Sequence, residues 1–451
     1  MTRAAQVCPD AWIRYTYLSP FRPKSAECPV GRAESFKLLK LSVDTRESEV
    51  RGVSAAWESE IVAVNESTPR PSQKNQEVLV VGGSAAGLYT AATVAAGGRS
   101  VRVLESRKGF EPASRSLIVT DHFRRQLGAA ASESIVNEIR RFELFTDGRS
   151  AQVALAQPDL IIERARLIPA LAHRARQAGA SLSFDTRFLG LAPNGRGLRV
   201  EVDSAGRREE LHADSVVGAD GAASRVAKTA GWPPIETVPL VQAIVRLPKD
   251  YRPDTTRVWF VPDDTPYFYW LIPESAERGA LGIIGVDGRD TKQCLERFLE
   301  KKQFEPLDWQ GARIPVYRRW VPVQRRVGNG DVYLVGDAAA QVKVSTVGGI
   351  VTGLRGALGV GQAILNRGGR TELSALRREL STHWLIRRVL HHFEQKDYSH
   401  LVDLLNESAR ESLGAINRDE STRLLWNVVR RQPRLVLLGL RGLLMGKGLR
   451  A

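Results

Sequence analysis

Glu77-Val-Leu-Val-Val-Gly-Gly-Ser-Ala-Ala-Gly87 is the stretch that decides the fold of this 451-residue chain. Its first five residues are typical of a buried β-strand, and a glycine-rich turn and a run of small helix-forming residues follow directly. A second apolar run, Val101–Glu105, comes next. The order strand, turn, helix, strand indicates the start of a βαβ unit, so we predict an α/β fold with a parallel sheet.

The glycine-rich turn resembles a dinucleotide-binding loop. It keeps the first and last glycines of the pattern G-x-G-x-x-G and has serine in the middle position. Glu105 ends the next strand 23 positions after Gly82, where its carboxylate can accept hydrogen bonds from an adenosine ribose. The free amides at the start of the helix suit a pyrophosphate. We therefore predict a Rossmann-like site, with an ordinary tight turn as the alternative. Its predicted residues are Gly82, Ser84, Ala86, Gly87 and Glu105.

Two later motifs indicate which dinucleotide is bound. The segments Gly218–Val226 and Val335–Val342 each place an aspartate, Asp220 or Asp337, just beyond a buried strand. An aspartate there can accept hydrogen bonds from the ribityl hydroxyls of a flavin. The glycine-rich helix start that follows Gly336, at Gly349 and Ile350, directs free amides at the pyrimidine edge of the flavin ring, where negative charge collects on reduction. The order and spacing of the three motifs predict FAD.

The rest of the chain suggests an interrupted nucleotide-binding domain. Strand-rich sequence with proline and aspartate turns predicts an inserted antiparallel-sheet substrate domain, and helical periodicity dominates beyond residue 348. We expect an N-terminal extension at 1–76, for which disorder is the simplest interpretation. The other predicted parts are two FAD-binding segments at 77–232 and 329–370, the substrate domain at 233–328, and a helical C-terminal region at 371–451.

Composition excludes several classes of protein. The chain has 43% hydrophobic residues and three widely separated cysteines, so a disulfide scaffold, a zinc ribbon and an iron–sulfur cluster are not expected. We predict no metal and a cytoplasmic protein.

Of the net charge of +15, seven positive charges lie in the last 31 residues, which contain no acid. This basic tail alternates with apolar clusters, which predicts either peripheral contact with a membrane surface or a packed helix with a solvated basic face. No motif for nucleic acid is present.

Three segments resemble the geranylgeranyl reductase family of FAD-dependent oxidoreductases, which has a p-hydroxybenzoate-hydroxylase-like fold. The most specific is Gly336–Ile350, in which Val344 and Val347 replace a proline and a glycine of the family. The segment Phe268-Tyr-Trp-Leu-Ile-Pro273 resembles the family's aromatic substrate-domain element, and Gln432–Leu438 resembles its C-terminal helices. The resemblance covers residues 77 to about 445.

The resemblance implies roles for further residues. Glu105 would hold the adenosine ribose, Arg164 would reach the FAD, Phe188 would meet the adenine region, and Asp337, Gly349 and Ile350 would contact ribityl chain and ring. Arg115 aligns with a family arginine near the flavin. Immediately after it, Ser116-Leu-Ile118 stands where those reductases carry Cys-x-Glu. The resemblance assigns substrate contacts to Phe268, Trp270 and Pro273.

These observations predict an FAD-dependent oxidoreductase that transfers hydride from reduced FAD to double bonds of a prenyl lipid. One alternative is a single-component FAD-dependent monooxygenase of an aromatic or apolar small molecule. Another is a flavin-containing electron-transfer or assembly partner without turnover. The chain has one dinucleotide fingerprint, at Gly82, so NADPH or another reductant would deliver electrons by transient docking. No catalytic acid can be assigned from the sequence.

Overall fold

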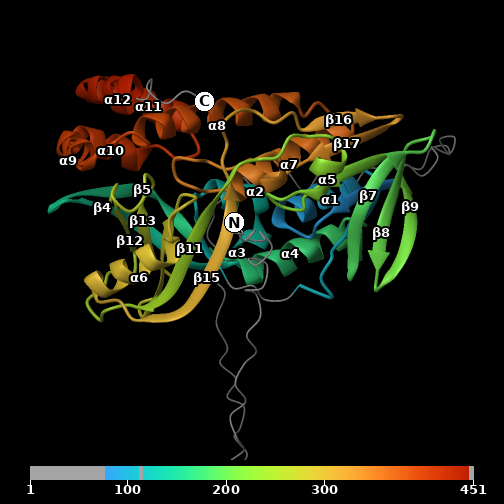
Figure 1. Cartoon of the computed structure of the whole chain (residues 1–451), viewed down its shortest axis with the longest axis horizontal. Coiled ribbons are helices and arrows are strands. Elements are labelled where there is room, and N and C mark those ends of the chain that lie inside the picture. The colour runs from blue at the N-terminus through green and yellow to red at the C-terminus, as the bar shows by residue number, and fades with distance from the viewer. Residues whose placement is uncertain (1–76, 111–114, 446–451) are drawn as a thin grey trace, which may run out of the picture. The chain divides into compact units, whose positions relative to one another are not determined.

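The computed structural model describes residues 77–110 and 115–445 (Figure 1). The predicted N-terminal extension, residues 1–76, lies outside the described residues. Within them the chain forms a six-stranded, an eight-stranded and a three-stranded sheet, with helices packed around the two larger ones.

The six-stranded sheet carries the nucleotide-binding motifs. Its strand order is β16-β17-β10-β1-β2-β6, and every neighbouring pair is parallel except β16 with β17. This arrangement confirms the α/β fold with a Rossmann-like parallel sheet. The strands are β1 (Glu77–Val81), β2 (Ser100–Leu104), β6 (Ser181–Ser183), β10 (Ser215–Gly218), β16 (Gln324–Val327) and β17 (Gly330–Leu334).

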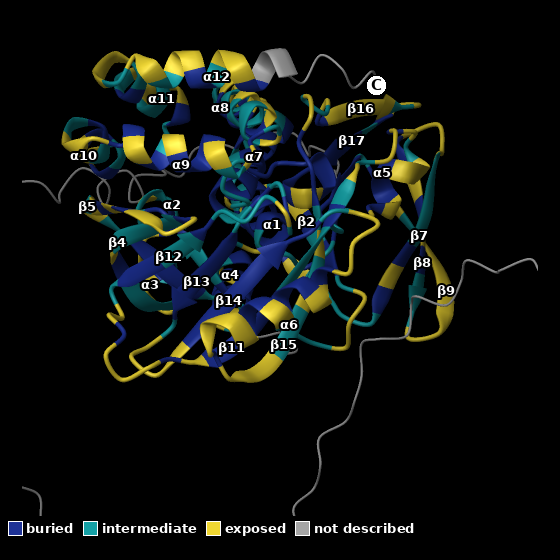
Figure 2. Ribbon diagram, turned by 60° about the vertical axis from the view of Figure 1, so that its left-hand side comes forward, coloured by how far each residue is buried: buried dark blue, intermediate teal, exposed yellow. Residues whose placement is uncertain are grey.

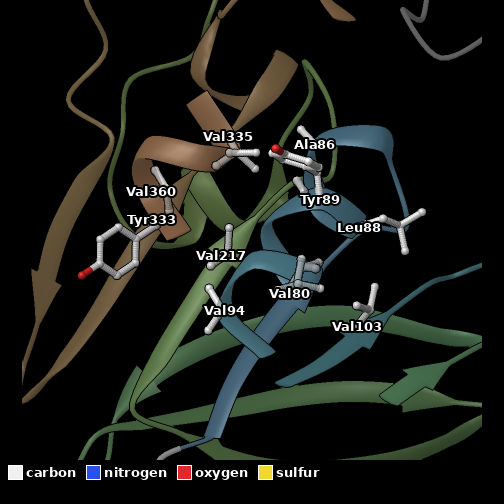
Figure 3. Packing of buried hydrophobic residues seen from close by; sticks show 14 of the residues in the cluster. Val80, Ala86, Leu88, Tyr89, Val94, Val103, Val217, Tyr333, Val335 and Val360 are labelled. Atoms are coloured by element: carbon white, nitrogen blue, oxygen red, sulfur yellow. The ribbon is translucent and has the colours of Figure 1, made fainter. Parts of the chain in front are cut away.

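Helices from distant parts of the sequence cover this sheet. Helix α1 (Ala85–Ala96) packs against both α4 (Arg164–Gln177) and α7 (Ile350–Ile364). Figure 3 shows side chains of β1, β10 and β17 meeting those of α1 and α7 in one apolar core. Strands that are buried on both faces are apolar along their whole length, which explains the unbroken apolar run Val78–Val81 in β1. The short elements η1 (Gly336–Ala339) and α5 (Arg225–Thr229) follow β17 and β10.

The eight-stranded sheet is mostly antiparallel and has the order β15-β11-β14-β13-β12-β4-β5-β3; β12 and β4 pair in parallel. Sequence analysis placed residues 116–163 in the first FAD-binding segment, whereas the structure pairs their strands with those of the predicted substrate domain. The strands are β3 (Ser116–Val119), β4 (Ile135–Thr146), β5 (Arg149–Glu163), β11 (Thr237–Arg246), β12 (Thr255–Trp259), β13 (Tyr269–Pro273), β14 (Arg278–Ile284) and β15 (Pro306–Pro315).

Strand β13 shows how this sheet separates two apolar cores. Successive side chains of a strand point to opposite faces. Tyr269 and Leu271 accordingly join the cluster under helix α6 (Thr291–Lys302), while Trp270 and Ile272 join the cluster on the other face. That second cluster includes Val344 and Val347 from the segment between η1 and α7. The predicted substrate sheet therefore turns one face toward the predicted flavin segment.

The remaining elements complete the described chain. The three-stranded sheet has the order β7-β8-β9, and its strand β7 contacts α5. The C-terminal helices pack on α7 and on β4 and β5, and Figure 2 shows exposed faces along several of them. These elements are β7 (Thr186–Pro193), β8 (Leu198–Ser204), β9 (Arg207–Ala213), α2 (His122–Leu127), α3 (Ala129–Ser132), α8 (Arg370–Leu390), α9 (Gln395–Leu404), α10 (Glu407–Ala415), α11 (Ser421–Arg431) and α12 (Arg434–Met445).

We predict that Gly282→Ala destabilises the protein by about 1–3 kcal/mol, because the added methyl group overpacks the core. A Cβ atom at Gly282 would lie 2.3 Å from Cζ2 of Trp270, so the indole would have to move. Gly311→Ala is the control, because a Cβ there meets only a backbone oxygen at 3.8 Å. Thermal unfolding followed by circular dichroism measures both variants, and equal midpoints would contradict the prediction.

Candidate functional site

A cavity of about 670 Å³ lies at the carboxyl ends of the parallel strands, between the six-stranded and eight-stranded sheets. Its wall is formed by the β1–α1 loop, the end of β2, the start of α4, the segments after β10 and β17, and the start of α7. Ligands of open α/β sheets bind at this edge. The structure therefore brings the three predicted cofactor motifs to one cavity.

Glu105 is held in place by the glycine-rich loop. The backbone amide of Gly83 donates a hydrogen bond of 2.9 Å to Oε2 of Glu105, and the amide of Arg107 donates one of 3.0 Å to Oε1. Ser84 caps α1, since its Oγ accepts a 3.2 Å hydrogen bond from the amide of Gly87. The carboxylate and the start of α1 consequently face the same end of the cavity, as a nucleotide requires.

Two glycines of the loop allow close backbone packing. Gly82 has a φ of +104°, and a Cβ on it would lie 2.6 Å from the carbonyl oxygen of Ala219. A Cβ on Gly87 would lie 2.3 Å from the carbonyl oxygen of Gly82. Gly87 does not line the cavity, unlike Gly82, Ser84 and Ala86. Its position supports a packing role behind the loop.

Asp220 lies at the cavity, but its carboxylate is occupied locally. One oxygen accepts a 2.6 Å hydrogen bond from Oγ of Ser224, and the other accepts from the amides of Arg225 and Val226 at 2.7 and 3.1 Å. Asp220 thus fixes the start of α5 beside Phe188, which is buried and also lines the cavity. Direct contact of either residue with the cofactor stays a prediction.

Arg115, Arg164 and Asp337 form a charged group within the cavity. Burial lowers the pKa of Arg115, and the nearby guanidinium of Arg164 lowers it further, while Asp337 raises it. The pKa of Arg164 is lowered by burial and by Arg107. For Asp337, enclosure within the cavity raises the pKa, and the two arginines oppose that rise. Each side chain therefore gains from an additional partner of the opposite charge or from a hydrogen-bonding ligand.

The start of α7 closes the other end of the cavity. Gly349 precedes the helix without a side-chain cap, so the first-turn amides are available to a ligand. A Cβ on Gly349 would lie 3.4 Å from Oδ1 of Asp337, which places Asp337 beside this helix start. Ile350 and Gly336 line the same region. Negative charge is favoured at a helix N-terminus of this kind.

The cavity fits FAD in charge as well as position. Six arginines and three acidic residues line it, so its wall carries a positive excess suited to a pyrophosphate. Among the described residues, the carboxylate of Asp337 has no hydrogen-bond partner although it faces the cavity. A carboxylate that lines the cavity beside free helix amides matches a ligand that carries both hydroxyl donors and carbonyl acceptors. The six arginines are Arg107, Arg115, Arg164, Arg187, Arg225 and Arg313, and the acids are Glu105, Asp220 and Asp337.

Sequence analysis did not identify Glu163, which positions two of the predicted residues. Its carboxylate accepts hydrogen bonds of 2.9 Å from the amides of Arg115 and Ala165, and so caps α4 directly before Arg164. Oγ of Ser116 also donates to it at 3.4 Å. The residue that replaces the family cysteine is thus bonded to Glu163 and is absent from the cavity wall. The sequence signal for this role was a glutamate directly before a predicted helix. Its hydrogen bond to the Arg115 amide could not be predicted in this way, because the two residues are 48 positions apart.

The apolar end of the cavity comes from residues that sequence analysis also missed. Leu117, Leu240, Ile314 and Val347 line it, and they belong to three separate strands and the segment before α7. These side chains carry no titratable group. A flavin ring and an apolar substrate would meet such a wall without burying an unpaired charge.

The predicted substrate residues lie beside this wall and do not form it. Phe268 and Trp270 pack in the same apolar cluster as Leu240, Ile314 and Val347, with their ring centroids 6.1 Å apart. The Nε1 atom of Trp270 is buried, and within the described residues it has no hydrogen-bond partner. Pro273 ends β13, where its carbonyl oxygen accepts a 2.9 Å hydrogen bond from Asn137. Substrate contact by these three residues stays a prediction.

Comparison with known proteins agrees with this geometry. The sequence profile of the FAD binding domain family matches residues 75–367, so the chain belongs to this family. It is an FAD-dependent oxidoreductase. A digeranylgeranylglycerophospholipid reductase of Methanopyrus kandleri is 28% identical over 62% of this chain and 74% of its own length. The resemblance to the geranylgeranyl reductase family is confirmed.

Solved structures share the fold. A geranylgeranyl bacteriochlorophyll reductase-like protein from Thermoplasma acidophilum superposes with a TM-score of 0.69 at 19% identity, covering 80% of this chain and 97% of that one. Aklavinone-11 hydroxylase, solved with FAD and aklavinone, gives a TM-score of 0.53 at 19% identity, covering 76% and 73%. One fold therefore accommodates proteins described as reductases and as hydroxylases, and the fold alone does not select the reaction.

We predict that Asp337→Ala weakens FAD binding at least about tenfold, because hydrogen bonds to a charged group contribute roughly 1.5–3 kcal/mol. Asp403→Ala, which removes an exposed carboxylate on α9, is the control. Fluorescence titration of the apoprotein with FAD gives both dissociation constants. Unchanged affinity in Asp337→Ala would refute the assignment of this carboxylate to the cofactor.

Proposed function

We propose that this protein reduces carbon–carbon double bonds of a prenyl lipid. The observation that carries the proposal is the continuity of the cavity: the wall near Asp337 and the start of α7 passes directly into the apolar wall of Leu240, Ile314 and Val347. Reduced FAD supplies a hydride equivalent from its N5 atom. The relatives named as reductases of a digeranylgeranyl lipid support a substrate of this class.

The residues around the cavity support a division of roles. Glu105, Arg164 and the start of α1 would bind the adenosine and pyrophosphate portion, whereas Asp337 and the start of α7 would orient the ring portion. Leu240, Ile314 and Val347 would hold an isoprenoid chain and exclude water from it. We assign the electron supply to NADPH or another reductant that docks transiently, because the chain carries one dinucleotide fingerprint, at Gly82.

Incubation of the dithionite-reduced, FAD-loaded protein with a polyprenyl lipid tests the reaction. We expect mass spectrometry of the anaerobic mixture to show added hydrogens in steps of about two mass units, one step per double bond. The matched control is the Asp337→Ala protein under identical conditions, which should yield less product in proportion to its FAD occupancy.

The same mixture in air with NADPH tests the monooxygenase alternative. One added oxygen in air, with no anaerobic change, would replace the reductase proposal by the monooxygenase. No change under either condition would exclude prenyl lipids as substrates. That result would leave the third hypothesis, a flavin-containing electron-transfer or assembly partner without turnover. Failure of the protein to oxidise any reductant would favour this hypothesis.

A second part of the proposal concerns peripheral contact with a membrane surface. Within residues 77–110 and 115–445, no helix is both long and apolar enough to cross a bilayer. The helices α11 and α12 nevertheless expose large apolar side chains, with Trp426 70% and Leu437 69% accessible. Arg430 and Arg434 are also exposed and lie between these two residues in the sequence. Exposed apolar side chains interspersed with arginines suit an anionic lipid surface.

We expect the protein to sediment with vesicles that contain phosphatidylglycerol and to bind phosphatidylcholine vesicles less. The double change Trp426→Ala and Leu437→Ser should reduce binding several-fold, because it removes apolar area that would enter the lipid interface. Leu307→Ser, at an exposed leucine of β15, is the matched control. Equal sedimentation of the double variant and the unchanged protein would contradict membrane contact through α11 and α12.

A further inference from the structure

Segment 341–349 joins η1 to α7 and has two distinct sides. Val342, Val347 and Gly349 line the cavity. Lys343 and Ser345 instead contact the C-terminal helical region, as their side-chain partners show. The segment that forms part of the cavity wall is therefore held from behind by residues that lie far along the sequence.

The conformation of this segment is strained. Val347 has a φ of +56°, a left-handed backbone conformation that is unfavourable for a β-branched residue. The amide of Val347 donates a 2.6 Å hydrogen bond to the carbonyl oxygen of Lys343, and the amide of Lys343 donates one of 3.0 Å to Gly348. Such a conformation persists only where surrounding contacts fix it. The contacts of Lys343 and Ser345 are candidates for that constraint.

Ser345 begins a hydrogen-bonded chain that runs into α8. Its Oγ lies 2.5 Å from Nδ1 of His383, and Nε2 of His383 lies 3.1 Å from Oε1 of Glu379, one helical turn away. The amide of Ser421, at the start of α11, donates a 2.8 Å hydrogen bond to the same glutamate oxygen. His383 is only 2% exposed, so a broken hydrogen bond here would not be replaced freely by water.

A buried ion pair supports the same segment. Nζ of Lys343 pairs with Asp419, which also accepts a hydrogen bond from Thr120. Lys343 and Asp419 are 5% and 3% exposed. Since removing one partner of a buried pair leaves an uncompensated charge, Lys343 is fixed in place as long as Asp419 is. Lys343 and Ser345, two positions apart in the segment, are thus both bonded to the C-terminal region.

The protonation state of His383 follows from its surroundings. Burial lowers its pKa, and the positive charge of Lys343 acts in the same direction, while Glu379 and Asp419 raise it. Because the balance favours the neutral ring, Nδ1 accepts a hydrogen bond from the Ser345 hydroxyl group, and Nε2–H donates one to the Glu379 carboxylate. This directional chain defines one orientation for the Ser345 hydroxyl.

We propose that the Ser345–His383–Glu379 chain positions the flavin-facing segment 341–349, so that helix α8 of the C-terminal region forms a functional part of the FAD site. None of the three side chains lines the cavity, so they are positioning residues that act through Val347 and Gly349. The proposal depends on the FAD assignment and is independent of the substrate.

Titration of the apoproteins with FAD tests it, with the visible absorption spectrum of the bound flavin as a second readout. We expect Ser345→Ala and His383→Gln to raise the dissociation constant about five- to twentyfold, since each loses a hydrogen bond that restrains the segment. The flavin spectrum should shift, because the ring environment changes. Ser150→Ala and His400→Gln, at exposed positions on β5 and α9, are the matched controls.

Glu379 provides a conservative rescue. In Glu379→Gln an amide oxygen can still accept from His383 and from the Ser421 amide, so FAD affinity should stay within about threefold of the unchanged protein. Glu379→Leu removes the acceptor and should resemble His383→Gln.

The proposal is overturned if Ser345→Ala and His383→Gln lower only the thermal midpoint while the FAD dissociation constant and the spectrum are unchanged. If His383→Gln does not fold, Ser345→Ala decides alone, because Ser345 is partly exposed and loses only a hydroxyl group. No prenyl lipid is present in the test, so its outcome is separate from that of the reductase assay.

Discussion

Close contact between α1, α7 and the turn after β17 is the constraint on which the site depends. A Cβ on Gly353 would lie 3.4 Å from Cα of Gly336 and 3.8 Å from Cβ of Ala86. A Cβ on Gly361 would lie 2.8 Å from Cγ2 of Thr93. The small residues let two helices that are more than 250 positions apart in sequence approach at the end of the sheet. Their N-termini can then serve one ligand, since the positive ends of both helices face one cavity.

The electrostatics of the cavity follow from that convergence. The cavity arginines come from α4, α5, β7 and β15 and from the segment between β2 and β3, and they outnumber the three carboxylates that line the cavity. Partly buried guanidinium groups close to one another, as at Arg115 and Arg164, are unfavourable without an anion, and an FAD pyrophosphate would supply it. An anionic ligand in the cavity would therefore gain favourable interactions with these guanidinium groups. Glu163 maintains the arrangement, because it fixes the backbone at Arg115 and caps the helix that carries Arg164.

The C-terminal helices link two surfaces of different character. Asp419, just before α11, and Ser421, its first residue, contact the buried groups behind segment 341–349. Five residues further on, the same helix exposes Trp426 among basic residues. The groups behind segment 341–349 and the lipid-facing surface that we propose therefore lie on the same helix.

The sequence by itself determined the α/β class, the Rossmann-like sheet, FAD as the cofactor and the family. Each of these rests on local order: a strand, a turn and a helix follow one another directly at Glu77–Ala96 and again around Asp337. Local motifs also predicted Gly82, Glu105, Asp337 and Gly349 as site residues, and the family resemblance predicted Arg164; all five line one cavity. Motifs that are far apart in the sequence could be assigned to one site, because the carboxyl ends of parallel strands meet at one edge of the sheet.

Only the tertiary structure decided which residues pack against those motifs and which form the facing wall of the cavity. Residues 116–163 join the eight-stranded sheet through pairing of β12 with β4, a contact across more than 100 positions that no local pattern encodes. Glu163, His383 and the apolar wall of Leu240 and Ile314 gain their positions in the same way. A hydrogen bond or an apolar contact depends on distance in space, whereas periodicity and spacing report only the local path of the chain.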